Sequence, residues 1–470
     1  MTGGFFWGTA GSAYQTEGAW QADGKSPSNW DVYTNTHRVV ERLTGRQETG
    51  NVAINAYDRA QWRADVALMR RLGINAHRFS LSWARLIPDG VGAVNPTSVA
   101  HYRAMIADLL EVGIAPVATL YHWDHPAVLD AQGGWRNPDS VGWFRNYARA
   151  AMTALGDLVA TFVTLNEPFI DLFLVVPMVQ NLIAGLPPRP TSAQYAEQVV
   201  AAHHWLLAHA QVMRDAHEAG RGHRVGIALP LSPATPADPA RAEDVAAAAR
   251  QDGLRNRWFL DALFRGDYPD DIMAIYRAHG TALRVSNADR ALLREARPDF
   301  LGVNYYAQAY VTADPDGAFG IGFTNPDAVP ACNGPVRPRA LFHLLLRLRD
   351  EYGDPRMMIT ENGAGFLGHD DAPHDGRVAD TLRCDYIVAH VDAVLAARQA
   401  GARVEGYFLW SLCDNFEWLW GTAPRFGLVH VDMQTQRRTP KDSFATYAGL
   451  IARGAGLSPS GACTPSPARR

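Results

Sequence analysis

Eight short apolar runs recur along the chain, and each has the length and composition of a β-strand. Longer segments with the helical spacing of apolar residues separate several of them. Such alternation is typical of parallel strands joined by helices, and eight units favour closure into a single (β/α)8 barrel. The expected strands are residues 7–14, 76–82, 115–121, 162–166, 225–229, 300–305, 357–360 and 404–410.

The expected helices end where a glycine interrupts the pattern. A glycine after the last turn can adopt the left-handed conformation that terminates a helix. Such glycines are Gly73, Gly113, Gly156, Gly220 and Gly401. The expected helices are residues 53–72, 98–112, 140–155, 194–219, 339–351 and 377–400.

An open, doubly wound sheet is the structural alternative. It requires a glycine-rich loop that follows the first strand and opens a helix, and residues 8–11 (GTAG) are not followed by such a helix start. We therefore expect one catalytic barrel domain over residues 1–453. Residues 313–338 are expected to form a long surface loop, and residues 454–470 a flexible tail.

Composition narrows the possible partners. The chain has 470 residues, a formal net charge of −4 and no run of Lys and Arg, so nucleic acid is not expected as a partner. The longest apolar run, residues 172–176, is too short to cross a membrane. Residues 1–7 lack the basic segment, apolar stretch and cleavage site of a leader, so a leader is not expected. We expect a cytoplasmic protein without metal or cofactor, with free thiols at Cys332, Cys384, Cys413 and Cys463.

Two short motifs each place a glutamate at the end of an expected strand. They are residues 164–168 (TLNEP), with Glu167, and residues 359–363 (ITENG), with Glu361. Barrel enzymes carry their chemistry at the carboxyl ends of the strands. Two glutamates there suggest a proton donor and a nucleophile, which is the arrangement used for glycoside hydrolysis.

Other polar and aromatic residues stand at the same strand ends. Mixed amides, acids and imidazoles match the hydroxyl groups of a sugar, and tryptophan offers an apolar face to its C–H surface. These residues are Gln15 and Glu17, Arg78, His122 to Asp124, Asn166, Asn304 to Tyr306, and Trp410 with Asp414 to Trp418.

Taken together, the ordered motifs resemble glycoside hydrolase family 1, the β-glucosidase family, over almost the whole chain. The matching segments are residues 7–18 (WGTAGSAYQTEG), 78–83 (RFSLSW), 121–124 (YHWD), 165–168 (LNEP), 304–306 (NYY), 359–363 (ITENG) and 410–418 (WSLCDNFEW). The resemblance implies a retaining (β/α)8 glycosidase that acts on small β-glycosides.

The resemblance also implies a role for each matching residue. Glu167 corresponds to the general acid/base and Glu361 to the nucleophile. Arg78, Asn304 and Tyr306 are expected around the nucleophile or the sugar's 2-hydroxyl. The residues expected to hold the non-reducing sugar are Gln15, His122, Asn166, Trp410, Glu417 and Trp418, together with Tyr306.

Simple electrostatics favours the same division of roles. Retention needs two carboxyl groups about 5–5.5 Å apart, one ionised and one protonated. A guanidinium from Arg78 and a phenol from Tyr306 would favour the ionised form of Glu361. Glu167 would keep its proton, because two close carboxylates resist double ionisation.

Several positions depart from the family pattern on the leaving-group side. Phe169 stands where tryptophan is usual, and residues 170–190 lack the usual His-Ala-Pro-Gly string. His125 stands where leucine is usual, and Thr422 where tyrosine is common. The aglycone side is therefore expected to be altered and more apolar.

Three interpretations remain open. The first is a β-glucosidase that tolerates β-galactosides or β-fucosides. The second is a specialised glycosidase or transglycosylase for a hydrophobic glycoside. The third is a silent sugar-binding barrel, which both glutamates argue against. A phospho-glycosidase is disfavoured because Glu417 would repel a phosphate, and His122 with His125 lacks the further ligands of a zinc site.

Overall fold

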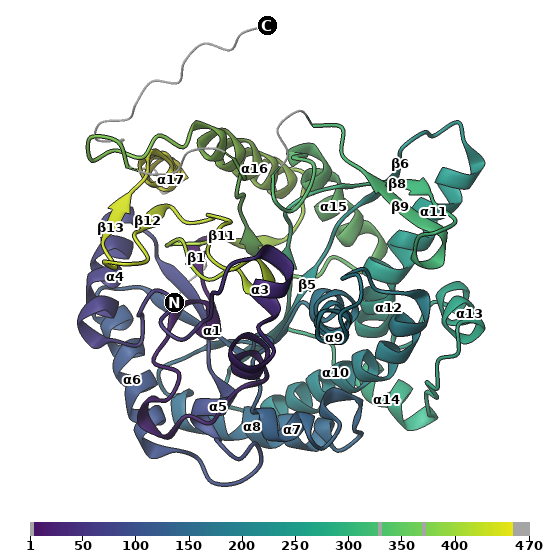
Figure 1. The fold of residues 1–470 in the computed structure, drawn as a ribbon, viewed down its shortest axis with the longest axis horizontal. Helices are drawn as coiled ribbons and strands as arrows, with labels where there is room; N and C mark the ends of the chain where they lie inside the picture. Colours follow the sequence, from purple (N-terminus) through teal and green to yellow (C-terminus); the bar gives the residue numbers. More distant parts are fainter. Residues whose placement is uncertain (1–3, 328–330, 369–372, 455–470) are drawn as a thin grey trace, which may run out of the picture.

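The computed structural model describes residues 4–327, 331–368 and 373–454. Eight parallel strands close into a barrel in the order β1-β11-β10-β7-β5-β4-β3-β2, which confirms the predicted fold (Figure 1). The strands are β1 (Phe6–Ala10), β2 (Ala76–Ser80), β3 (Ala115–Tyr121), β4 (Thr161–Asn166), β5 (Arg224–Pro230), β7 (Phe300–Asn304), β10 (Met357–Asn362) and β11 (Val404–Trp410).

The barrel interior is a packed core. One side chain from each strand contributes to it, and the set includes small and large residues that fill the space inside an eight-stranded barrel. These residues are Ala10, Ala76, Val117, Val163, Ala228, Phe300, Met358 and Phe408.

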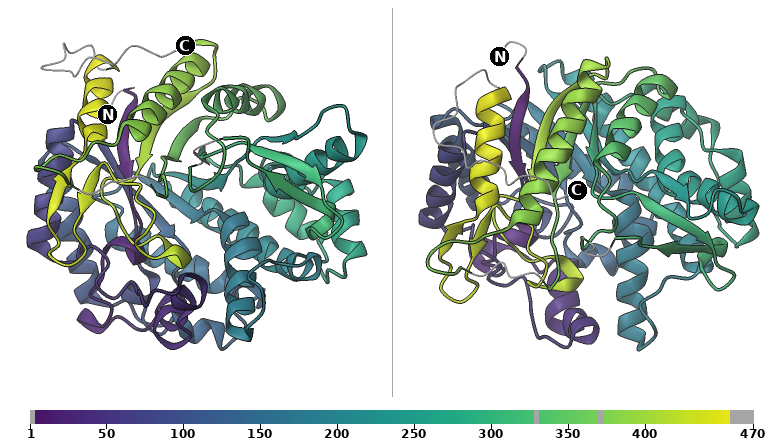
Figure 2. Two further views of the ribbon diagram at one scale, coloured as in Figure 1. Left: turned by 45° about the horizontal axis from the view of Figure 1, so that its top comes forward. Right: turned by 90° about the horizontal axis from the view of Figure 1, so that it is seen from above.

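A ring of helices covers the outside of the barrel, and α16 and α17 pack side by side in both views of Figure 2. The long helices are α4 (Arg59–Leu72), α6 (Pro96–Glu111), α8 (Ser140–Leu155), α10 (Ser192–Ala219), α15 (Pro338–Glu351), α16 (Thr381–Gln399) and α17 (Asp442–Gly454). The expected helix over residues 53–72 begins only at Arg59. Asp58 caps it by accepting hydrogen bonds from the backbone N–H groups of Ala60 and Gln61.

The connection between β5 and β7 contains elements that the sequence patterns did not reveal. They are β6 (Ala234–Pro236), α11 (Ala242–Asp252), the π-helix η5 (Gly253–Arg257), α12 (Trp258–Arg265), α13 (Asp270–Ala278) and α14 (Asn287–Glu295). The expected loop over residues 313–338 is also wrong in part. It contains η6 (Ala318–Gly320) and β9 (Ile321–Thr324), and β9 forms a small sheet with β6 and β8 (Ala309–Ala313) beside α11 (Figure 1).

Shorter elements surround the carboxyl end of the barrel. After β1, β2 and β3 they are α1 (Ala13–Thr16), η1 (Ala22–Gly24), α2 (Asn29–Asp31), η2 (Val32–Thr36), α3 (Val39–Thr44), α5 (Trp83–Leu86), α7 (Ala127–Asp130) and η3 (Gly134–Arg136). Further along the chain they are η4 (Ile170–Val175), α9 (Val176–Ala184), η7 (Trp418–Trp420), β12 (Val429–Val431) and β13 (Arg438–Pro440).

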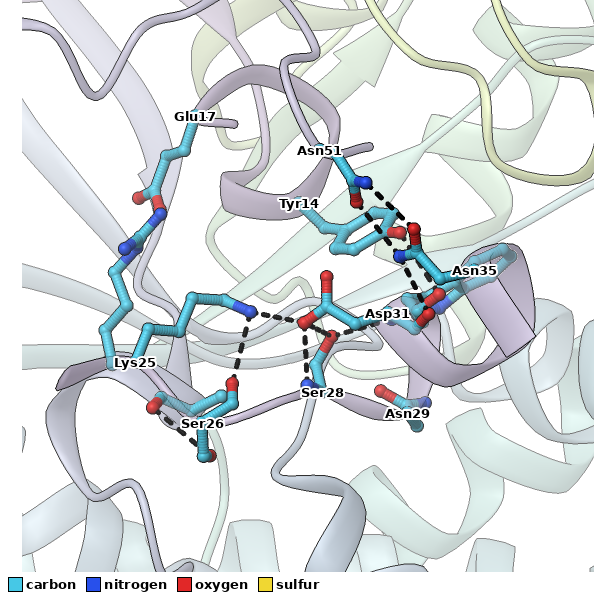
Figure 3. A network of polar contacts seen from close by, with 12 residues as sticks. Tyr14, Glu17, Lys25, Ser26, Ser28, Asn29, Asp31, Asn35 and Asn51 are labelled. Carbon is cyan, nitrogen blue, oxygen red and sulfur yellow. Dashed lines mark hydrogen bonds and ion pairs between the residues drawn. The ribbon is translucent and has the colours of Figure 1, made fainter. Parts of the chain in front are cut away.

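A polar network fixes the segment that follows β1 (Figure 3). Asp31 lies at its centre, where its carboxylate pairs with Lys25 and accepts hydrogen bonds from the backbone and side chain of Ser28. The side-chain amides of Asn35 and Asn51 bond each other at 2.9 and 2.8 Å. This network holds residues 25–51 in one arrangement.

Glu17 belongs to this structural layer and not to the site predicted at the strand ends. Its carboxylate accepts hydrogen bonds from Arg85 at 2.6 Å and from the hydroxyl of Tyr102 at 2.8 Å, and Glu17 and Arg85 are almost fully buried. The guanidinium of Arg85 also lies over the ring of Tyr57. A buried arginine with these partners depends on the single carboxylate that neutralises it.

Three cysteines of the described chain, Cys332, Cys384 and Cys413, are free thiols, and Cys463 lies outside the described residues. The expected tail over residues 454–470 also falls outside them, apart from Gly454, the last residue of α17. Among the described helices, none is long and apolar enough to span a membrane.

We predict that Glu17→Gln destabilises the protein by about 3–5 kcal/mol, because it leaves a buried guanidinium uncompensated. Asp157→Asn is the matched control: Asp157 also pairs with an arginine, Arg103, but this pair is exposed and should matter little. Urea denaturation of both variants measures the difference. A midpoint for Glu17→Gln equal to that of the control would show that the buried pair is not needed for stability.

Candidate active site

A cavity of about 840 Å³ opens at the carboxyl ends of the barrel strands, and Glu167, Glu361 and Glu417 line it. A second cavity of about 810 Å³ lies outside the barrel near α6 and α8, and no acidic side chain lines it. Only the first of the two therefore combines volume with groups that can transfer protons or attack a substrate.

Irregular strand pairing aims both central glutamates into this cavity. The register between β4 and β5 shifts between Val163 and Asn166, just before Glu167. The register between β10 and β7 shifts between Ile359 and Glu361. Such irregularities redirect side chains at the rims of barrels and occur often next to active sites.

Glu361 is held by two strong hydrogen-bond donors. Arg78 donates to its Oε1 at 2.6 Å, and the Tyr306 hydroxyl donates to its Oε2 at 2.7 Å. Burial and the nearby carboxylates raise the pKa of Tyr306 well above its usual range, so the phenol keeps its proton and remains a donor. Both oxygens of Glu361 are therefore bonded in the manner that suits a carboxylate anion.

Glu167 has a different environment. Its Oε1 accepts a hydrogen bond from the amide of Asn304 at 2.9 Å, and no cation bonds to its carboxyl group within the described structure. Its backbone is left-handed, with φ of 53°, and its N–H bonds the carbonyl of Ala228 at 2.9 Å. Strained backbone of this kind is found preferentially at functional sites.

The two environments place the proton of the pair on Glu167. Burial and, next, the charge of Glu361 raise the pKa of Glu167 to about 8. Burial also raises the pKa of Glu361, but Arg78 and Tyr306 act in the opposite direction. Because Glu361 is bonded directly by the charged guanidinium of Arg78 and by the Tyr306 hydroxyl, whereas Glu167 is bonded by a neutral amide, the ionised form belongs to Glu361 and the neutral form to Glu167.

Asn166 and Asn304 connect the two carboxyl groups. Asn166 Oδ1 accepts hydrogen bonds from Arg78 at 2.6 Å and from the Asn304 amide at 3.0 Å. Asn304 Oδ1 accepts one from the hydroxyl of Thr360 at 2.6 Å. These bonds fix the orientation of both amides, and through Asn304 they fix the position of Glu167.

Four of the remaining residues predicted to bind sugar, His122, Trp410, Glu417 and Trp418, line the cavity, and Gln15 supports Glu417 from behind. The amide of Gln15 donates to Glu417 at 3.2 Å, and burial followed by the charge of Glu361 raises the pKa of Glu417 to about 8. His122 lies 5.7 Å from Trp410 and 5.9 Å from Trp418, ring centre to ring centre. Burial and Arg78 lower the pKa of His122 far below its usual range, so the imidazole is neutral.

The network in Figure 3 reaches this wall through Tyr14. The Tyr14 hydroxyl bonds the carbonyl of Trp30 at 3.1 Å, and the Tyr14 ring stacks on Trp418 at 5.8 Å. Trp30 also packs against Trp418, with 4.5 Å between ring centres. The position of Trp418 in the cavity thus depends on the segment after β1.

The structure divides the predicted site residues into a lining and a supporting layer. Glu167, Glu361, His122, Tyr306, Trp410, Glu417, Trp418 and Phe169 line the cavity. Four others do not line it and contact the lining residues from behind, namely Gln15, Arg78, Asn166 and Asn304. Asp124 and Tyr305, named with the strand ends, also lie outside the lining, and Tyr305 bonds the carbonyl of Arg337.

The part of the cavity around Phe169 carries several apolar side chains. The rings of Phe169 and Phe173 stack with 5.5 Å between their centres. Of the stretch 175–183, all of it described by the structure, only Val175 and Met178 line the cavity. Exposed apolar side chains continue this surface at the rim, where Phe323, Leu367 and Trp420 are 62%, 58% and 49% exposed.

His125, which also departs from the family pattern, does not converge with His122. Its ring nitrogens lie 3.0 Å from the Tyr121 hydroxyl and 2.8 Å from Asp130. Asp171 bonds the same tyrosine, and burial raises the pKa of Asp171 to about 7. His125 is therefore part of a buried polar cluster with Tyr121 and with Asp171 of η4.

Sequence reasoning missed the lining residues that come from the connection after β5. Ser232, Gln251 and Arg255 line the cavity, as does Tyr195 of α10. Arg255 stands in the stretch 249–257, which carries no motif, and its proximity to Glu167 follows only from the closure of the barrel.

Comparison with known proteins gives a consistent match. The family model described as glycosyl hydrolase family 1 matches residues 1–455. Beta-glucosidase A of Enterobacter agglomerans is 41% identical over 97% of this chain and 95% of its own length. A bifunctional beta-D-glucosidase/beta-D-fucosidase of Bifidobacterium breve is 37% identical over 96% of this chain and 97% of its own. The structure of the Thermotoga maritima beta-glucosidase in complex with glucoimidazole superimposes with a TM-score of 0.86, at 36% identity over 96% of this chain and 98% of that chain.

We predict that Glu361→Gln lowers the pKa of Glu167 below its value of about 8 in the parent. The negative charge of Glu361 disfavours a second anion, so its removal favours ionisation of Glu167 and the proton is lost at lower pH. A ¹³C-detected NMR titration of the carboxyl groups measures the pKa of Glu167 in both proteins. The Glu167 signal is assigned as the one that disappears in Glu167→Gln. Glu405→Gln, which removes a remote carboxylate paired with Arg224 and Arg356, is the control. An unchanged pKa in Glu361→Gln would contradict the coupling.

Proposed function

The chain belongs to glycosyl hydrolase family 1, and from this membership we propose that it is a β-glucosidase that removes terminal non-reducing β-D-glucosyl residues with retention of configuration. The observation that carries the proposal is the unequal pair of buried carboxyl groups. Glu361 is bonded by Arg78 and Tyr306, and Glu167 is bonded only by the amide of Asn304 among the described residues. One group is prepared to attack and the other to donate a proton.

In the first step, a carboxylate oxygen of Glu361 attacks the anomeric carbon. The bond to the aglycone oxygen breaks, and this oxygen takes the proton of Glu167. The products of the step are a glycosyl ester on Glu361 and an ionised Glu167. Formation of the ester removes the charge that raised the pKa of Glu167, which stabilises its anion.

In the second step, Glu167 accepts a proton from water while the water oxygen attacks the anomeric carbon from the opposite face. The ester bond breaks, Glu361 leaves as a carboxylate, and Glu167 regains its proton. Two inversions give net retention. Arg78 and Tyr306 stabilise the charge that returns to Glu361.

Recognition of the sugar is assigned to the part of the cavity lined by His122, Trp410, Glu417 and Trp418. Glu417, oriented by Gln15, offers oxygens to two hydroxyl groups. Neutral His122 accepts from the Asn166 amide at Nε2 and so has its proton on Nδ1, which can donate to a hydroxyl group. Trp410 and Trp418 supply apolar faces to the pyranose ring. The bifunctional name of the Bifidobacterium breve relative supports tolerance of β-fucosides, which lack one hydroxyl group of a β-galactoside.

A more specialised preference for apolar leaving groups has its own support. Phe169, Ile170, Leu174 and Met178 form an apolar wall next to Glu167. A hydrated sugar leaving group would place unpaired hydroxyls against this wall, whereas an alkyl or aryl group would bury apolar area on it. The silent-barrel interpretation has no such support, because both carboxyl groups and their partners are in place.

We predict that Glu167→Ala separates substrates by leaving group. Dinitrophenyl β-glucoside needs little protonation, so its first step should survive and a covalent glycosyl-enzyme should accumulate in mass spectra. Alkyl β-glucosides should lose activity by about 10²–10⁴-fold, the usual contribution of general acid catalysis. Equal losses on both substrates would assign Glu167 a structural role and sink the proposed mechanism.

We also predict that kcat/KM for octyl or aryl β-glucoside exceeds that for cellobiose by at least about tenfold, or roughly 1.4 kcal/mol. Phe169→Trp should narrow the gap, because a flat indole restores a stacking platform for a sugar. The measurement is kcat/KM of the parent and of Phe169→Trp for each of the two substrates. If the parent cleaves cellobiose as well as octyl glucoside, the preference for apolar leaving groups is wrong, and the protein is an ordinary cellobiose-cleaving β-glucosidase.

A further inference from the structure

One cationic side chain stands in the apolar wall beside Glu167. Arg255 belongs to the π-helix η5 (Gly253–Arg257) and lines the cavity. Its Nε donates a hydrogen bond to the carbonyl of Pro230 at the end of β5, at 2.9 Å. The guanidinium carbon lies 5.5 Å from the centre of the Phe169 ring. These two contacts fix the planar group over the leaving-group side.

The charge of Arg255 has no carboxylate partner in the described part of the chain, and neither terminal nitrogen has a hydrogen-bond partner there. Neighbouring arginines differ in this respect. Arg257, two residues further on, pairs with Asp271 and Asp252, and Arg347 also pairs with Asp252. Arg189 at the cavity rim pairs with Asp314.

An unpaired cation at this place is unfavourable for the enzyme without ligand. Burial lowers the pKa of Arg255, although a guanidinium stays protonated in proteins. Its charge also lowers the pKa of Glu167, which works against a group that must hold a proton. An anion bound to Arg255 would remove both effects at once.

We propose that Arg255 binds a carboxylate carried by the leaving group, so that the enzyme acts on β-glucosides of small apolar acids such as aromatic carboxylic acids. This inference rests on the proposed β-glucosidase function and specifies its substrate class. The two free terminal nitrogens form the fork that matches a planar carboxylate. Phe169 beside it, with Leu174 and Met178 in the lining of the same cavity, suits the aromatic body that carries the acid.

A single positive charge also selects the type of anion. Glu361 carries a negative charge in the same cavity and repels other negative groups, so an anion is favoured only where it lies on the guanidinium. A monoanionic carboxylate is balanced by one arginine, and a phosphate dianion is not. The acidic group thus belongs on the aglycone, away from the sugar and from Glu417.

The test compares 4-carboxyphenyl β-D-glucoside with its neutral counterpart, 4-carbamoylphenyl β-D-glucoside, on each protein. The ratio of the two kcat/KM values cancels changes in the chemistry common to both. Arg255→Met should lower this ratio by at least about tenfold, in the range expected when a charged hydrogen-bonded partner is lost. Arg255→Lys should lower it less, because the charge remains without the fork.

Arg257→Met is the matched control, because it removes a paired cation from the same π-helix that does not line the cavity, and it should leave the ratio unchanged. Arg255→Gln, which retains a donor, takes the place of Arg255→Met if that variant does not fold. An unchanged ratio in a folded Arg255 variant overturns the inference while the β-glucosidase function stands. A parent protein that cleaves neither substrate nor any aryl β-glucoside overturns the proposed function itself.

Discussion

Two carboxyl groups buried in one cavity cannot both carry a charge without strong repulsion, and the site is organised around that constraint. Arg78 and Tyr306 support the anion on Glu361, and a neutral amide supports the protonated form of Glu167. The charge difference exists before substrate binds. A retaining glycosidase needs this asymmetry, because its first step uses one carboxyl as nucleophile and the other as acid. The same coupling then lets Glu167 ionise once Glu361 forms its ester.

The barrel supplies the geometry that this asymmetry requires. Glu167 follows directly after β4 and Glu361 is the last residue but one of β10, and irregular pairing at both strand ends directs their side chains into the cavity. Arg78 from β2 crosses beneath to reach Glu361 and Asn166. The segment after β1 contributes through the network of Figure 3, which supports Tyr14 and so the position of Trp418. The positions of the cavity residues therefore depend on contacts between segments that are far apart in the sequence.

Much of this arrangement could be predicted from the sequence, and the differences have physical causes. The strand 115–121 was predicted with its observed bounds because its apolar run is uninterrupted, whereas 7–14 ends early because α1 begins at Ala13. Glu17 stands at a strand end like a site residue, but it faces Arg85 and not the cavity. The local sequence pattern does not reveal whether a side chain at a strand end points into the cavity or toward a neighbouring loop. Arg255 carries no motif, and only the closed barrel brings it beside Glu167.

The division of roles between the two glutamates is tested most directly by azide rescue. With an activated aryl β-glucoside, Glu361→Gly should be almost inactive, and azide should restore turnover by entering the vacated space to give the α-glucosyl azide. Glu167→Ala should instead give the β-glucosyl azide, because azide attacks a covalent α-linked intermediate on Glu361. NMR of the two products reports the anomeric configuration. This account predicts opposite anomers in that order, and a β-glucosyl azide from Glu361→Gly would contradict it.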